Sequence, residues 1–461
     1  MVKMRKEKDL LGELEVPANV YYGINTERAV RNFKISEKRM PVEFIVALAQ
    51  VKKACMLANL EHGDVEESVG NAVLEAVDEI LKKDMYLDQF PIDIYQTGSG
   101  TQTNMNMNEV LANRANEILG HPMGMKSPVH PNDHVNKGQS SNDVIPTAMH
   151  VAALTALSND LLPAVDKLMR TLDDKISEFR GIVKVGRTHL QDAVPIPLSL
   201  EFKVYRTQVM SAFEALQDVR SDLVRLPIGG TALGTGINAP EGFSQRVAKH
   251  LTKIVGFPFE INAVQAEGIA SHIAFVKLSS ALRMLALSCL KMANDIRWMA
   301  TGPRAGLGEL HLPENEPGSS IMPGKINPTQ SEALIQVAMQ VMAFDMAISL
   351  GEGYGSVLDL NVAKPLIITN TLEALKILSN GIYSFVDKCL VDLSANESAI
   401  KSQLERSLMV VTRLTPVVGY DKAGEIARVA LEKGLTIREA INDMGLKIDG
   451  LDELLDPSRM I

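Results

Sequence analysis

Apolar residues recur at intervals of three and four along the middle of the chain. One such run begins at Phe202 and continues through Tyr205, Val209, Phe213, Leu216, Val219, Leu223 and Leu226. Because an α-helix has about 3.6 residues per turn, this spacing places the whole run on one face of a single long helix. The same periodicity predicts further helices at 42–60, 65–83, 105–118, 152–179, 271–300, 330–350 and 366–386.

Two of the predicted helices, 271–300 and 330–350, are apolar on nearly every face. In a water-soluble protein such a helix has to be enclosed by other helices, in the same chain or in neighbouring copies. We therefore expect a mainly α fold with a central bundle of about five long helices, and homo-oligomerisation through that bundle. Near residue 394 the pattern changes to shorter amphipathic helices, which predicts domains at 1–139, 140–393 and 394–461.

The composition excludes several classes of protein. Of the 461 residues, 46% are apolar and 22% are charged, which is typical of a folded globular chain and unlike a disordered one. Only 5% are aromatic, whereas 22 residues are Met, and this balance favours helix-on-helix packing over β-sheet. The net charge of −9, without any basic run, predicts no nucleic-acid or membrane partner.

The N-terminus, the longest apolar stretches and the cysteines bear on the cellular compartment. Residues 1–9 are mostly charged and contain no apolar signal-peptide core. The most apolar stretches, around 278–290 and 333–344, are shorter than the roughly 18 residues that a membrane span requires. The three cysteines are odd in number and far apart, which argues against a disulfide framework. We therefore expect a cytoplasmic protein.

Four polar segments are candidates for chemistry. The densest, 318–328, has two glycines and two prolines that interrupt any regular helix, and its Lys325 and Asn327 suit anion binding. The alternative for this segment is a plain turn between helices. Segments 97–104 and 139–143 each precede a predicted helix, where they either bind an anion at the helix N-terminus or only cap the helix. In the fourth, 186–192, a histidine lies among polar residues rather than on an apolar stripe.

A metal site is not predicted. His130 and His134 are four residues apart, but Pro131 lies between them, so they do not form a helical zinc pair. The sequence also contains no Gly-x-Ser-x-Gly motif, phosphate loop or dinucleotide fingerprint. We therefore expect neither a metal nor an organic cofactor.

Segment 318–328 reads GSSIMPGKINP, which closely resembles the GSSxMPxKxNP signature of the fumarase/aspartase superfamily. The resemblance extends over nearly the whole chain, through TGSGTQTNMNMNEVLANRA from Thr97, HPNDHVNKGQSSND from His130, GRTHLQDAVP from Gly186 and SLMVVTRLTPVVGYDKAGEIA from Ser407. Where fumarases and aspartases typically differ, at 98–102, 140–142 and 329–330, the chain resembles class II fumarases.

The resemblance implies a homotetramer with a helical core contributed by all subunits, in which each active site combines segments of three chains. It implies a metal-free hydro-lyase that interconverts fumarate and (S)-malate. Ser319 is then the base that removes the carbon-bound proton, and His189, paired with Glu332, acts at the water or hydroxyl side. The same resemblance implies that substrate is bound by Ser99, Gly100, Thr101, Ser140, Ser141, Asn142, Thr188, Ser320, Lys325, Ile326 and Asn327.

The implied chemistry explains why these residue types are needed. Removing a proton next to a carboxylate creates a doubly charged aci-carboxylate, which requires preorganised donors around the developing charge. Serine is a very weak base in water, so its alkoxide has to be stabilised by loop N–H groups, a nearby cation and exclusion of water. Such a loop is expected to close over substrate and open again. From the sequence, His189 as a mere binding residue stays an alternative.

A second site is implied by His130, Pro131, Asn132 and Asp133, which match a non-catalytic dicarboxylate site of fumarases. Some members of the family have an arginine three residues before this histidine, whereas this chain has Ser127 there, beside Lys126. A structural loop without a ligand is therefore the alternative for this segment.

Two other functions remain open from the sequence, an ammonia-lyase acting on aspartate and an inactive structural oligomer of the same fold. The net charge of −9 would repel a dicarboxylate, so attraction of the substrate has to be local. We expect it to come from Lys325, Arg187 and the helix N-termini.

Overall fold

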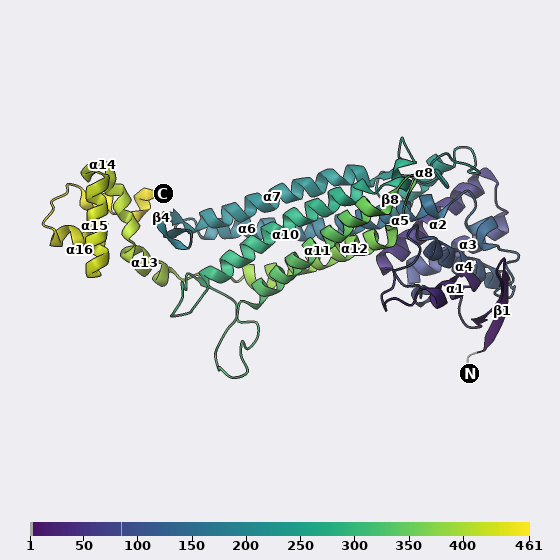
Figure 1. The fold of residues 1–461 in the computed structure, drawn as a ribbon, viewed down its shortest axis with the longest axis horizontal. Helices are drawn as coiled ribbons and strands as arrows, with labels where there is room; N and C mark the ends of the chain where they lie inside the picture. Colours follow the sequence, from purple (N-terminus) through teal and green to yellow (C-terminus); the bar gives the residue numbers. More distant parts are fainter. Residues whose placement is uncertain (1–2, 84) are drawn as a thin grey trace. The chain divides into compact units, whose positions relative to one another are not determined.

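The computed structural model describes residues 3–83 and 85–461, so Met1 and Val2 of the charged N-terminal stretch lie outside the described residues. Most of the described chain is helical (Figure 1). The long helices predicted from periodicity are present, with ends that differ from the prediction: α6 Leu162–Glu178, α7 Leu198–Leu223, α10 Ile273–Met299, α11 Thr329–Gly355 and α12 Lys364–Phe385.

The apolar stripe that predicts α7 is the buried face of that helix. Phe202, Val209, Leu216 and Leu223 are fully buried, whereas Phe213 is only half-buried. Upstream, α5 (Ser141–Ala156) continues through a π-helical turn, Leu157–Leu161, directly into α6. The helix predicted at 152–179 is therefore the second part of a longer, uninterrupted helical segment.

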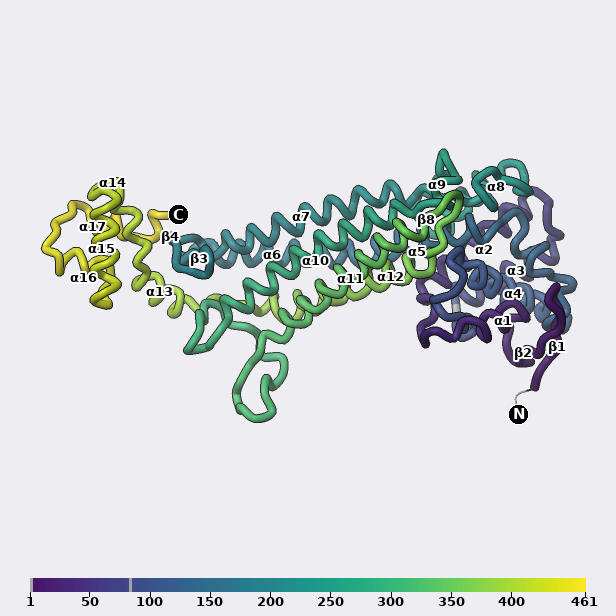
Figure 2. Tube along the Cα trace, in the orientation of Figure 1, coloured from purple at the N-terminus to yellow at the C-terminus, as the bar shows by residue number. Residues whose placement is uncertain are grey.

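The remaining helices have at most 21 residues. The N-terminal part of the chain contains α1 Ile24–Asn32, α2 Val42–His62, α3 Glu67–Lys83 and α4 Thr101–Ile118, and α8 Phe243–Val255 and α9 Glu267–Ala270 follow α7. Five helices end the chain (Figure 2): α13 Glu397–Arg406, α14 Thr415–Val418, α15 Tyr420–Lys433, α16 Ile437–Asp443 and α17 Leu451–Leu454. The last four contribute to one apolar cluster, whereas α13 contacts β3.

Strands occur only in pairs in the described part of the chain. Two antiparallel hairpins have strands of six or seven residues, β1 Met4–Asp9 with β2 Gly12–Pro17 and β3 Val183–Thr188 with β4 Gln191–Pro197. The other pairs are two residues long: β5 Arg225–Leu226 with β6 Glu260–Ile261, β7 Leu310–His311 with β10 Ser394–Ala395, and β8 Ser356–Val357 with β9 Leu360–Asn361. The strands therefore hold pairs of loop segments together and do not form a β-sheet core.

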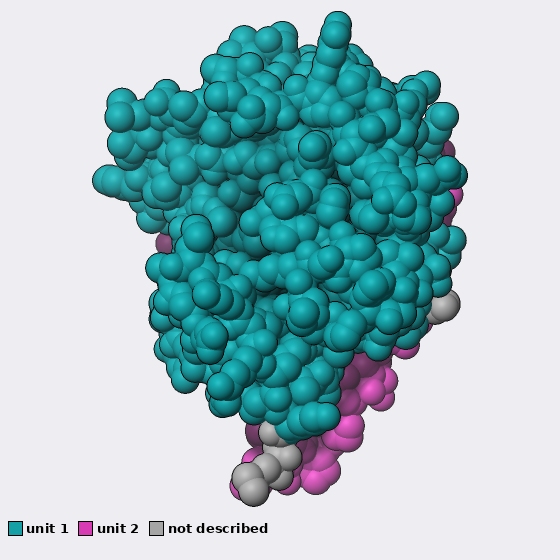
Figure 3. All heavy atoms as spheres, turned by 90° about the vertical axis from the view of Figure 1, so that its right-hand side faces the viewer, with its two compact units in different colours: residues 1–163, 213–284, 340–378 teal, residues 164–212, 285–339, 379–461 magenta. Residues whose placement is uncertain are grey.

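The chain divides into two compact units. Unit 1, teal in Figure 3, comprises 1–163, 213–284 and 340–378, and unit 2 comprises 164–212, 285–339 and 379–461. The chain passes between them five times, and each passage falls inside one of the helices α6, α7, α10, α11 and α12. The units therefore do not follow the predicted three-part division, which stays a prediction.

Helices α10 and α11 are longer than the apolar stretches expected from the sequence. Both have 27 residues and are apolar enough to cross a membrane by length and composition, although core helices of soluble proteins pass the same test. Less than half of the apolar window of each helix is buried within the chain. Large apolar side chains are accordingly exposed on them, including Leu287 and Trp298 on α10 and Met339, Met346 and Leu350 on α11. Exposed apolar faces of this kind are typical of surfaces that contact another molecule.

Candidate active site

The first cluster of predicted site residues lies in unit 1, where α4 begins. The helix starts at Thr101, four residues earlier than expected, and Gly100 precedes it with a φ of +76° and no side-chain cap. The interpretation of Thr101 or Thr103 as simple capping residues is therefore wrong. The Thr101 hydroxyl instead lies 2.8 Å from that of Ser99 and 2.8 Å from that of Ser141, so three hydroxyls form a chain.

The N-terminus of α5 joins this cluster through Ser141. Ser140 caps α5, since its hydroxyl accepts the N–H of Asn142 at 3.2 Å, and Asp143 completes the capping box by accepting the N–H of Ser140 at 2.9 Å. Capping, one of the two alternatives for this segment, is thus confirmed. Because the N-termini of α4 and α5 are joined by these hydroxyls, their free N–H groups and positive dipole ends provide a place for a carboxylate.

Asp143 also fixes the neighbouring turn, a role that the sequence did not indicate. The carboxylate is fully buried and accepts the N–H groups of Gly229 and Thr231, each at 2.9 Å. Burial raises the pKa of Asp143, while the three donated N–H bonds oppose that rise. The side-chain amide of Asn142 donates to the carbonyl of Ala232 at 2.9 Å, so the same turn holds this predicted binding residue.

Gly98 is required by the path of the backbone beside it. A Cβ atom on Gly98 would lie 1.5 Å from the carbonyl oxygen of Val362, and the Gly98 carbonyl accepts the N–H of Lys364 at 3.0 Å. Lys364 is fully buried, which lowers its pKa to about 7. The segment before α12 therefore supports the hydroxyl-bearing loop from behind.

The second cluster of predicted residues belongs to unit 2. His189 and Leu190 form the two-residue turn of the β3–β4 hairpin, with φ values of +56° and +60°. Turns of this kind match the twist of the two strands but normally require Gly or Asn, so two other residues here store local strain. Thr188 and His189 are both exposed at the hairpin tip.

Ser319 lies in the loop between β7 and α11. Its Oγ atom accepts backbone N–H groups of its own loop, from Ile321 at 3.2 Å and from Met322 at 3.0 Å. These donors provide the local support that an alkoxide on this serine would require. Ser320 and Ile326 are exposed on the same loop.

Lys325 and Asn327 close the loop on itself. The Lys325 ammonium donates to the side-chain oxygen of Asn327, whose amide donates to the Gly318 carbonyl at 2.6 Å. The Gly318 N–H in turn donates to the Lys325 carbonyl at 2.8 Å, and a Cβ atom on Gly318 would lie 2.3 Å from that oxygen. These hydrogen bonds order the segment internally, and its ability to bind an anion stays a prediction.

Arg187 does not have the role expected from the sequence. Its guanidinium donates to Glu309 at 2.6 Å and to Gln403 at 3.0 Å. The expectation that Arg187 attracts substrate is therefore wrong, because its charge is already neutralised by a carboxylate. The sequence does not indicate Glu309, which is fully buried and forms an ion pair with Arg187.

Some predicted partners are not joined within the described part of the chain. Glu332 is exposed in the first turn of α11, and no hydrogen bond or ion pair among the described residues links it to His189. In the predicted second site, the His130 Nδ1 atom accepts the N–H groups of Asn132 and Asp133, and thereby caps the π-helical turn Pro131–Val135. The Lys126 ammonium donates to the Lys8 carbonyl, so it does not stand free beside this site.

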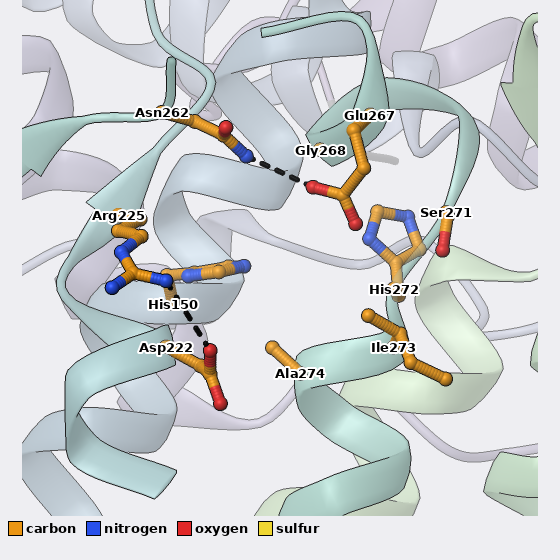
Figure 4. Close-up of a pocket in the computed structure, with 10 residues that line it drawn as sticks. All are labelled: His150, Asp222, Arg225, Asn262, Glu267, Gly268, Ser271, His272, Ile273 and Ala274. Atoms are coloured by element: carbon orange, nitrogen blue, oxygen red, sulfur yellow. Dashed lines mark hydrogen bonds and ion pairs between the residues drawn. The ribbon is translucent and has the colours of Figure 1, made fainter. Parts of the chain in front are cut away.

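A separate cavity of about 220 Å³ lies in unit 1, with His150 and His272 on opposite sides of it (Figure 4). Burial lowers the pKa of His150 to about 4 and that of His272 well below its usual value, so both are neutral at pH 7. The His150 Nδ1 atom lies 3.1 Å from the Leu223 carbonyl. None of the predicted site residues lines this cavity, and it is therefore not part of the candidate site.

Comparison with known proteins agrees with the geometry. A family model described as Lyase matches residues 12–343, and one described as Fumarase C C-terminus matches residues 410–461. The fumarate hydratase class II of Nitrosomonas europaea is 49% identical over 461 residues, covering 100% of this chain and 99% of its own. Two solved structures each cover 99% of both chains: class II fumarase of Schistosoma mansoni (TM-score 0.95, 36% identity) and fumarate lyase:delta crystallin of Brucella melitensis (TM-score 0.94, 39% identity).

These findings define the chain as a lyase with a mainly α, long-helix fold. Within that class, the full-length match to many fumarate hydratases shows that the chain belongs to the class II fumarate hydratase family. The predicted resemblance and fold class are thereby confirmed.

Proposed function

We propose that this chain catalyses the reversible anti addition of water to fumarate, giving (S)-malate through an aci-carboxylate intermediate. The observation that carries the proposal is the Ser319 hydroxyl oxygen, which accepts the N–H groups of Ile321 and Met322. In the dehydration direction, Ser319 takes the carbon-bound proton of malate as base. The two N–H groups offset the negative charge that makes a serine alkoxide costly.

The developing charge on the substrate is stabilised by donors on the same loop. Lys325 supplies a cation and Asn327 an amide donor, and their mutual hydrogen bond keeps both side chains preorganised. At the hairpin tip, Thr188 binds substrate and His189 acts at the hydroxyl side, where Glu332 orients it. The imidazole then exchanges a proton with the water that adds or leaves.

The substrate's carboxylate is bound at the N-termini of α4 and α5. Ser99, Gly100, Thr101, Ser140, Ser141 and Asn142 contribute hydroxyls, an amide and backbone N–H groups, and three of the hydroxyls already form one hydrogen-bonded chain. This local attraction operates despite the net charge of −9. The N-terminal dipole ends of α4 and α5 therefore supply the attraction for substrate that Arg187 does not supply.

We propose that the active enzyme is a cytoplasmic homotetramer in which each active site combines residues of three subunits. The exposed apolar faces of α10 and α11 support this, because further copies of the chain would bury them. The exposed positions of His189 and Glu332 are compatible with pairing across a subunit boundary. The tetramer is expected in size-exclusion chromatography with light scattering.

For the segment His130–Asp133 we propose a second dicarboxylate site. With Nδ1 occupied by backbone N–H groups, the His130 Nε2 atom carries the proton and is left as a donor. Fumarate binding measured by calorimetry in an active-site variant, with and without His130→Asn, tests this site separately.

The main experiment follows fumarate by its ultraviolet absorbance when purified protein is given malate. Turnover is expected in the presence of a chelator, with a loss of roughly 10²-fold or more in Ser319→Ala and His189→Asn. Ser398→Ala and His62→Asn, at exposed positions outside the site, are matched controls with expected wild-type rates. Ammonia release from aspartate exceeding malate turnover would assign the chain to the ammonia-lyases, and absence of both activities would leave a structural oligomer.

A further inference from the structure

A buried lysine and a partly buried arginine meet on one buried carboxylate in unit 2. Glu309 is fully buried, and its Oε1 atom lies 2.6 Å from Nη1 of Arg187. Its Oε2 atom lies 3.2 Å from Nζ of Lys184, which is itself only 1% exposed. Lys184 also reaches Glu201 on α7 at 3.1 Å. The cluster therefore neutralises its charges internally.

The members of this cluster come from segments that are far apart in the sequence. Lys184 and Arg187 are on β3, and Arg187 directly precedes the predicted site residues Thr188 and His189. Glu309 directly precedes β7, from which the chain enters the loop that carries Ser319. The ion pair between Arg187 and Glu309 thus joins the base of the hairpin tip to the base of the Ser319 loop.

The backbone around Glu309 is fixed as firmly as its side chain. Its N–H donates to the Met299 carbonyl and its carbonyl accepts the N–H of Asn396, both at 2.8 Å. Gln403 on α13 accepts a hydrogen bond from Arg187 and donates its own amide to the Leu307 carbonyl. Glu309 is therefore a rigid anchor, against which the position of Arg187 is set.

Stability alone does not explain such a cluster, because well-packed apolar residues often replace a buried ion pair without loss of stability. The hairpin tip, in contrast, has a specific need for support. His189 and Leu190 hold positive φ angles that non-glycine residues adopt only when the surrounding structure imposes them. Arg187 is bonded at both terminal nitrogens and is one residue away from Thr188, so it supplies that support.

We propose that Glu309 is a positioning residue for the reaction: acting through Arg187, it holds the His189 hairpin tip in register with the base of the Ser319 loop. This inference rests on the proposed function. Glu309 itself is fully buried and has no access to substrate. Glu309 contributes only through the geometry of the hairpin. Its replacement should therefore change kcat rather than KM.

The test compares Glu309→Gln and Arg187→Lys with Arg114→Lys, which alters another Arg–Glu pair, on Glu79, outside the site. We expect kcat to fall roughly 10²-fold in both cluster variants while KM changes less than about threefold, because a displacement of about 1 Å is enough for such a loss. Arg114→Lys should retain wild-type kcat. Circular dichroism and tetramer content establish that each variant is folded, and Arg187→Lys carries the test if Glu309→Gln does not fold.

The decisive measurement combines these changes with His189→Asn. If Glu309 acts through His189, then adding Glu309→Gln to His189→Asn lowers kcat by less than about threefold, whereas Glu309→Gln alone lowers it far more. The limb of the kcat–pH profile that disappears in His189→Asn should also shift in Glu309→Gln. Fully additive losses, or a raised KM with unchanged kcat, would overturn the positioning role while leaving the proposed function intact. Wild-type kcat in His189→Asn would instead refute the proposed function.

Discussion

Replacing Gly98 by Ala is expected to disable the enzyme by moving the hydroxyl-bearing loop rather than by removing a catalytic group. The new Cβ atom would meet the Val362 carbonyl oxygen at 1.5 Å, so the two segments have to separate by about 2 Å to reach ordinary van der Waals distance. The contact is with backbone on both sides, so no side chain can rotate to relieve it. The hydrogen bond from Lys364 to the Gly98 carbonyl is lost at the same time.

The size of the effect follows from this displacement. Ser99 and Thr101 lie one and three residues after Gly98. A misplacement of about 1 Å in positioning residues costs about 10²-fold in rate. We therefore expect kcat/KM for malate to fall at least 10²-fold in Gly98→Ala, measured by fumarate absorbance. Gly424→Ala is the matched control, because a Cβ atom there has nothing within 4 Å and Ala favours the helix α15 by about 1 kcal/mol. Wild-type kcat/KM in a folded Gly98→Ala variant would refute this reasoning.

Two further predictions concern stability. The pKa of His150 is lowered by burial to about 4 from its usual 6.5, so as pH falls through this range the unfolded chain takes up a proton that the folded chain refuses. About 3 kcal/mol of the free energy of unfolding is therefore lost as the pH falls from 6.5 to 4. In His150→Asn the thermal unfolding midpoint should depend less on pH over that range, and an unchanged pH dependence would contradict this. Ile426→Ala, in the buried C-terminal cluster, should cost about 2–5 kcal/mol in denaturant unfolding, against at most about 0.5 kcal/mol for the exposed Leu431→Ala, and equal costs would argue against that core.

The long helices could be predicted from the sequence because their burial is periodic. In α7 the predicted stripe from Phe202 to Leu223 is the buried face, and the neighbouring helices differ from expectation mainly in their ends. The start of α4 at Thr101 was missed because its cap is a glycine in a left-handed conformation, which the sequence marks only weakly. The division of the chain into units was not predictable, since it depends on tertiary contacts inside continuous helices.

The candidate site was predictable only in part from physical reasoning. The residue composition of the loop 318–328 and of the segment before α5 is unusual enough to mark both as candidates. In the structure, each segment is ordered by local hydrogen bonds, to the hydroxyl of Ser319 in the first and to that of Ser140 in the second. The roles of individual residues came from the resemblance to a family. The ion pair between Arg187 and Glu309 could not be predicted from local sequence patterns, because the two residues are 122 positions apart and neither segment indicates its partner.

The passage of five helices through both units has a consequence for how the chain is made and destroyed. Each boundary falls within a hydrogen-bonded helix, so a protease meets no linker at any of the five passages. Helices melt cooperatively along their length, so damage on one side of a passage spreads to the other. Quality control in the cell is therefore expected to encounter either the intact chain or a fully unfolded one, without a stable half-molecule between them.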